Sequence, residues 1–114
     1  MSPQRSLKGM GTSRRAKALA LLGIAQRAGA VVKGTDATRR VLRKGDVRLV
    51  LLAEDGSETQ RSKVLPLARA RGVPWKIFGD RAELGAAVGS GPLTVVGVTQ
   101  PSFAKELQEQ LGRD

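Results

Sequence analysis

The sequence predicts one α/β domain in which helices cover both faces of a sheet, as a three-layer α/β/α sandwich. Short apolar runs alternate with helical segments along the chain, which is typical of strands packed between helices. A chain of 114 residues can bury one core, and neither an internal repeat nor a dividing linker is found. We therefore expect residues 12–114 to form a single domain.

The N-terminal segment differs in character from the rest of the chain. Residues 1–11 contain glycine, serine, proline and bases without periodicity, and they predict a flexible basic tail. Thr12 or Ser13 can cap a first helix, which is expected to run to about Ala28 because Gly29 can end it.

A short strand and a second helix are expected next. Residues 31–32 form the strand, and residues 34–36 open the helix, with Asp36 at its favourable positive end. The helix should end at Gly45. Residues 47–53 are almost wholly apolar, which predicts a strand covered on both faces.

The third helix is indicated by Ser57 and Gln60, which have the spacing of a capping box. It should run toward Arg71, and Pro66 is expected to kink or divide it. A strand over residues 75–78 follows.

The C-terminal part repeats the same alternation. Asp80 and Glu83 predict the cap of a fourth helix, which should close near Gly89. Residues 93–98 form a strand, and Pro101 suits the first turn of a final helix.

The composition excludes several kinds of chemistry. The chain has no cysteine and no histidine, which removes thiolate catalysis, a Cys/His zinc site and the usual general base near neutral pH. Any catalysis would therefore rest on Ser, Thr, Lys or carboxylate side chains alone. The missing cysteines fit a reducing compartment.

Export is the alternative for the N-terminal region, because Arg14 and Arg15 precede an apolar run over residues 18–25. That run is too short to span a membrane. Gln26 and Arg27 also stand immediately before the small residues that would form a cleavage site. A cytoplasmic protein that does not contact membranes is the favoured interpretation.

The charge is strongly one-sided. The formal net charge is +10, and residues 1–45 hold eleven Lys and Arg residues against one acid, whereas residues 46–114 hold nine of each sign. Such an excess predicts a polyanionic partner, above all nucleic acid. Aromatic residues number three, too few for platforms on which bases stack. Recognition should therefore depend on charge, backbone groups and shape.

Two segments are candidate binding elements. Residues 33–40 place a glycine at a helix start, with Asp36 and Arg40 one helical turn apart. The simpler interpretation is a capped helix with a solvated ion pair. Residues 89–95 combine small and apolar residues in a loop, for which a plain helix-to-strand turn is the simpler interpretation.

The order of motifs resembles the ribosomal L7Ae family, whose members bind kink-turns in RNA, and within it the bacterial YlxQ-type branch. The resemblance covers about residues 15–111. The landmarks, in order, are residues 22–29 (LGIAQRAG), 33–35 (KGT), 50–55 (VLLAED), 65–67 (LPL), 72–74 (GVP), 83–85 (ELG) and 96–99 (VGVT).

The resemblance implies a mixed four-stranded sheet and a single RNA surface, formed by the start of the second helix and the loop before the last strand. Gly34 matches a glycine whose backbone lies against RNA, and Arg81 matches a basic position near the bound backbone. The loop matches the stretch that packs over a flipped-out nucleotide. The implied site consists of Lys33, Gly34, Thr35, Asp36, Ala37, Arg40, Arg81, Gly91, Pro92, Leu93, Thr94 and Val95.

Three positions depart from the family pattern. Asp36 stands where many members have asparagine, Ala37 where they have glutamate and Arg40 where they have lysine. Aspartate only accepts hydrogen bonds and adds negative charge, whereas Arg40 keeps a positive charge. The departures favour RNA binding in general over tight recognition of the standard kink-turn.

The expected protein is thus a non-catalytic monomer, without metal or cofactor, that binds structured RNA, either ribosomal RNA or another RNA, at the ribosome or elsewhere in translation. Two alternatives stay open: a protein-interaction module, and a nonspecific nucleic-acid-binding protein with an incidental basic tail.

Overall fold

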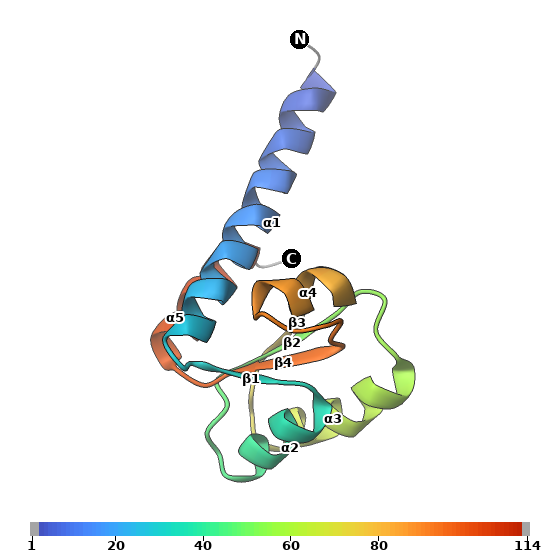
Figure 1. Cartoon of the computed structure of the whole chain (residues 1–114), viewed down its shortest axis with the longest axis vertical. Coiled ribbons are helices and arrows are strands. Elements are labelled where there is room, and N and C mark those ends of the chain that lie inside the picture. Colours follow the sequence, from blue (N-terminus) through green and yellow to red (C-terminus); the bar gives the residue numbers. More distant parts are fainter. Residues whose placement is uncertain (1–2, 113–114) are drawn as a thin grey trace.

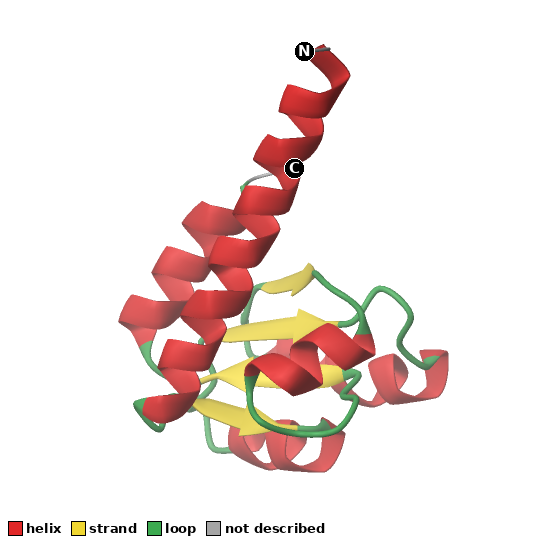
Figure 2. Cartoon of the chain, turned by 45° about the horizontal axis from the view of Figure 1, so that its top comes forward, coloured by secondary structure: helices red, strands yellow, loops and turns green. Residues whose placement is uncertain are grey.

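A computed structural model describes the backbone of residues 3–112 and the side chains of residues 14–112. The predicted α/β/α sandwich with a mixed four-stranded sheet is confirmed (Figures 1 and 2). In chain order the elements are α1 (Pro3–Arg27), β1 (Val31–Lys33), α2 (Thr35–Arg43), β2 (Leu49–Leu52), α3 (Glu58–Ala70), β3 (Trp75–Ile77), α4 (Arg81–Ala87), β4 (Val95–Val98) and α5 (Pro101–Leu111).

The sheet has the strand order β1-β4-β2-β3. β2 and β3 are parallel, whereas β4 runs antiparallel to both of its neighbours, β1 and β2. Every residue of β2 and β4 is buried. Such strands need cover on both faces, which explains the unbroken apolar run of β2.

Alternate residues of β2 serve two separate cores. Leu49 and Leu51 pack with buried residues of α1, α4 and α5, whereas Val50 and Leu52 pack with those of α2 and α3. Figure 1 shows these two groups of helices on opposite sides of the sheet, and Figure 2 shows α5 lying alongside α1. The two layers follow from the period of two along a strand.

α2 lies unusually close to β4 because Gly97 has no side chain. A Cβ atom on Gly97 would lie 2.8 Å from Cγ2 of Val32 and 3.1 Å from Cγ2 of Thr38, which is fully buried. Substitution would force Val32 of β1 and Thr38 of α2 away from β4. Gly97 therefore helps to set the position at which α2 begins.

The predicted start of the first helix is wrong. α1 begins at Pro3 and not at Thr12 or Ser13, so residues 3–11 are helical rather than irregular. Proline is compatible with a first helical turn, and each glycine in this segment costs only about 1 kcal/mol of helix stability. Figure 1 shows this part of α1 projecting from the body of the molecule.

Pro66 does not divide α3, which was one of the two expected effects, since the helix runs without a break through it. Val64 and Ala68, on either side of Pro66, are both fully buried against the sheet. Their packing holds the two halves of the helix in place, while Pro66 itself is exposed. The predicted cap is confirmed, because the Gln60 amide donates to Oγ of Ser57 at 3.3 Å.

None of the helices in the described part of the chain has the length and apolar character that crossing a membrane requires.

Deletion of residues 1–11 should shorten α1 without weakening the fold. The first fully buried side chain that the structure describes in α1 is Ala18, so we expect the free energy of unfolding to change by less than about 0.5 kcal/mol. A urea titration monitored by circular dichroism measures this free energy of unfolding. Leu22→Ala, which empties a buried site, is the control and should cost about 2–5 kcal/mol. A comparable loss on deletion would show that residues 1–11 belong to the core.

Candidate nucleic-acid interface

Gly34 turns the chain from β1 into α2. Its φ of 90° lies in the left-handed region that favours glycine. Its N–H donates to the Val95 carbonyl at 2.9 Å, and its own carbonyl accepts from the Thr38 amide at 3.1 Å. Gly34 thus joins the start of α2 to the start of β4.

The N-terminus of α2 has no side-chain cap, because glycine occupies the N-cap position. The first amides of a helix have no acceptor within the helix, and they carry partial positive charge. Here these amides belong to Thr35, Asp36 and Ala37. Such a terminus is suited to an anion or to the polar edge of a base.

A surface hollow of about 460 Å³ opens at this terminus. Among the described residues that line it, the cations are Lys33, Arg40 and Lys63, and the only acid is Asp36. These lining residues are Lys33, Gly34, Thr35, Asp36, Ala37, Arg40, Gln60 and Lys63. The positive charges outnumber the negative one, which favours a negatively charged ligand.

Gln60 and Lys63 were missed by sequence reasoning. They come from α3 and lie three residues apart, so they share a helix face. That spacing alone gives no sign of a site. Their contribution depends on the packing of α2 against α3, which brings both side chains to the hollow.

Asp36 and Arg40 line the same hollow, but they form no ion pair among the described side chains. Both are exposed. Arg39 is different, because it is partly buried and lies outside the hollow. The exposed Arg40 side chain is therefore available to a ligand in the hollow, whereas Arg39 does not line it.

The loop before β4 lies against Gly34. Cδ2 of Leu93 is 4.0 Å from the position that a Cβ on Gly34 would take. The Leu93 amide donates to the Arg81 carbonyl at 3.0 Å, which fixes the loop to the start of α4. Gly91 and Pro92 are exposed and Leu93 is half-buried. The structure therefore brings the two candidate segments together.

Two predicted residues of this loop have mainly structural contacts. Val95 is fully buried in the core beneath α2 and α3, so its side chain cannot meet a ligand. Thr94 is half-buried, and its carbonyl accepts from the Ala53 amide at 2.9 Å. Of the predicted loop residues, Gly91 and Pro92 are therefore the exposed ones, and Leu93 and Thr94 are half-buried.

Arg81 lies outside the hollow and is paired with Asp55. Its backbone N–H donates to Oδ1 of Asp55 at 2.8 Å, and its Nε lies 3.5 Å from Oδ2. The backbone hydrogen bond from Arg81 is the main cause that lowers the pKa of Asp55. Arg81 thus connects the β2–α3 loop with the loop that carries Leu93.

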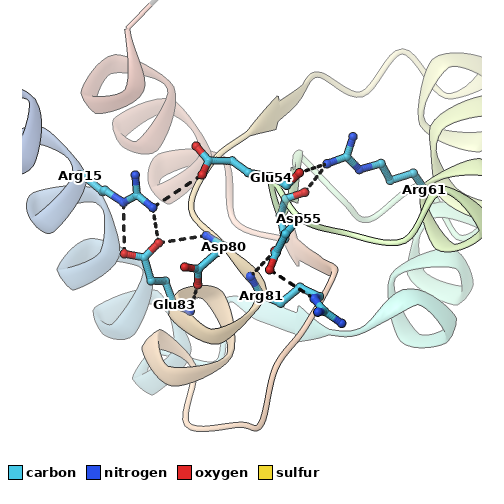
Figure 3. A network of polar contacts seen from close by, with 8 residues as sticks. Arg15, Glu54, Asp55, Arg61, Asp80, Arg81 and Glu83 are labelled. Atoms are coloured by element: carbon cyan, nitrogen blue, oxygen red, sulfur yellow. Dashed lines mark hydrogen bonds and ion pairs between the residues drawn. The ribbon is translucent and has the colours of Figure 1, made fainter.

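A second polar network holds α1 to α4 (Figure 3). Arg15 makes two hydrogen bonds to the Glu83 carboxylate, and Glu83 in turn closes a capping box with Asp80. Arg15, followed by the Asp80 amide, lowers the pKa of Glu83. Arg15 also lies near Glu54, with Nη2 3.7 Å from Oε1.

Arg61 of α3 donates to the carbonyls of Ala53 and Glu54. Figure 3 shows Arg61 beside Glu54. These contacts fix the β2–α3 loop to α3, and the Ala53 amide, which donates to the Thr94 carbonyl, joins it to the loop before β4. Across the described side chains, no group of three or more His, Cys, Asp or Glu residues is arranged to hold a metal ion.

Residues 16–108 match the family described as "Ribosomal protein L7Ae/L30e/S12e/Gadd45 family", and the chain belongs to it, as its motifs predicted. Within the family it belongs to the YlxQ-type branch.

Two relatives carry the name "RNA-binding protein YlxQ". The one from Bacillus subtilis (strain 168) is 40% identical over 87 residues, which are 76% of this chain and 87% of the relative. The one from Enterococcus faecium is 32% identical over 100 residues, which are 88% and 96% of the two chains. These names denote binding proteins, and the prediction of a non-enzymatic protein is confirmed.

Solved structures share the fold. A Bacillus halodurans protein described as having unknown function has a TM-score of 0.80 and 32% identity, and the match covers 84% of this chain and 97% of that one. The "Giardia lamblia 15.5kD RNA binding protein" has a TM-score of 0.71 and 23% identity, over 88% and 86% of the chains.

Gly85→Ala should disturb the Leu93 loop, because a Cβ on Gly85 would overlap the carbonyl group of Gly91. Backbone atoms must then move, so we expect a loss of about 1–3 kcal/mol in unfolding free energy. Gly91→Ala is the matched control, since a Cβ there meets no atom within 4 Å, and it should change stability by less than about 0.5 kcal/mol. Chemical denaturation compares the two variants. Equal stabilities would mean that α4 does not hold the loop.

Proposed function

We propose that this protein binds structured RNA of the kink-turn kind without catalysing a reaction. The observation that carries the proposal is the uncapped start of α2, which opens into a hollow with three cations beside an apolar side chain, Leu93. The names of its YlxQ relatives support RNA as the partner.

The geometry suits a sharply bent RNA. A kink-turn crowds phosphates on one side and exposes base edges that a regular RNA helix hides in its deep groove. The amides of Thr35, Asp36 and Ala37 can donate to such a polar edge, and Lys33, Arg40 and Lys63 can neutralise the crowded phosphates. Leu93, which lies beside Gly34, can cover an extruded base.

Asp36 shapes the specificity of this interface. It brings a negative charge into the hollow, and Ala37 offers no polar side chain. Recognition of base edges then depends on backbone amides, and affinity on the flanking cations. We propose a site that selects RNA shape more than base identity.

The proposal extends to the setting of the protein. We propose a cytoplasmic monomer that acts at the ribosome or elsewhere in translation. A protein-interaction module and a nonspecific nucleic-acid-binding protein are the competing functions.

The test compares neighbouring arginines. Arg40→Ala should cost about 1–3 kcal/mol of affinity for a kinked RNA, since Arg40 lines the hollow. Arg39→Ala should cost much less, because Arg39 lies outside it. Asp36→Asn should hold or improve affinity, because it removes a negative charge and restores a donor. Titrations against a kinked RNA and a straight duplex of equal length measure all three.

The controls separate the competing functions. Equal losses for Arg39→Ala and Arg40→Ala on both RNAs would reduce the site to a nonspecific basic surface. Equal binding of DNA and RNA by the unaltered protein would also indicate a nonspecific basic surface. A protein partner that is captured without RNA, together with no binding of either RNA, would identify an interaction module.

A further inference from the structure

A second group of cations lies at the opposite end of α2 and α3. We call it the distal patch, and it consists of Arg43, Lys44, Arg48 and Arg71. Nη2 of Arg71 donates to the Arg43 carbonyl at 2.6 Å, which joins the C-terminal ends of the two helices. Arg48 and Arg71 line a hollow of about 280 Å³, together with Gly45 and Gly72.

The charges of the distal patch are not compensated. None of its four cations forms an ion pair among the described side chains, whereas Arg15 and Arg81 both do. Asp46 is the only acid in the two loops that follow α2 and α3. A helix C-terminus favours nearby cations, but Arg48 lies outside any helix. Helix ends alone therefore do not explain the cluster.

A basic path connects this patch to the proposed RNA site. Arg40 lines the first hollow, and Arg43 follows it by three residues, so these two side chains share one face of α2. Lys44 follows directly as the C-cap of the helix. α2 has nine residues and is therefore about 13 Å long. One structured RNA can span both hollows.

We infer that the distal patch binds the phosphate backbone of a helical stem that flanks the kinked region. The inference rests on the proposed function and extends it, because it assigns a footprint along α2 to the same RNA. Exposed, unpaired cations around a shallow hollow can follow a phosphate backbone without reading bases. The contribution of the patch should therefore depend on stem length and salt, and not on sequence.

The experiment uses two double variants of the full chain. Arg43→Gln with Arg48→Gln removes two charges from the distal patch and leaves the Arg43 carbonyl in place. Lys17→Gln with Lys105→Gln is the matched control, since it removes two exposed charges from α1 and α5, on the other side of the sheet. The probes are a kinked RNA with both stems intact and two versions in which one stem is cut back to the kink.

We expect the distal variant to bind the intact RNA several-fold more weakly than the control does, with a salt dependence shallower by about two in the slope of log K against log salt. One of the shortened RNAs should bind both variants equally. If the two variants lose the same affinity on every RNA, the inference is wrong while the proposed function stands. If the unaltered protein does not prefer kinked to straight RNA, the proposed function fails and the inference fails with it.

Discussion

The close docking of α2 on β4 is the constraint on which the candidate site depends. Gly97 allows Thr38 and Val32 to approach the strand, and Gly34 donates its N–H to the Val95 carbonyl. Both contacts fix where α2 begins. They place an uncapped helix terminus beside Leu93, and the site is the consequence of that placement.

The frame around the site is built from interactions between distant segments. Arg15 and Glu83 are 68 residues apart, and Arg81 and Asp55 are 26 apart. They tie α1, α4 and the β2–α3 loop to one another, so the loop with Leu93 is anchored from two sides. A rigid frame matters because an RNA shape can be selected only by a surface that keeps its own shape.

Local patterns in the sequence are enough to predict most of the fold. The alternation of elements, the cap at Ser57 and the capping box of Asp80 with Glu83 depend on residues close in the chain, and all are found in the structure. The start of α1 was not predictable in this way, since glycine and proline only weaken a helix. The predicted division of α3 at Pro66 is wrong for a related reason, because the buried residues Val64 and Ala68 on either side of it keep the helix continuous.

The site itself could be predicted only in part. The motifs of residues 33–40 and 89–95 identified two segments, and packing brings them together. Gln60 and Lys63 depend on contacts between helices, which a sequence does not display. Net charge was also ambiguous, because the basic excess of residues 1–45 lies on α1, on β1 and at α2, and α1 and α2 lie on opposite faces of the sheet. Of that excess, Lys33 of β1 and Arg40 of α2 line the proposed interface.

The most direct measurement of the central claim is the change in backbone amide NMR signals when a kinked RNA is added. If the uncapped terminus of α2 binds RNA, the largest shifts will be those of the Thr35, Asp36 and Ala37 amides, with Leu93 shifting alongside them, and the amides of α5 will stay in place. Shifts concentrated on α1 and α5, with the α2 terminus unmoved, would contradict the account.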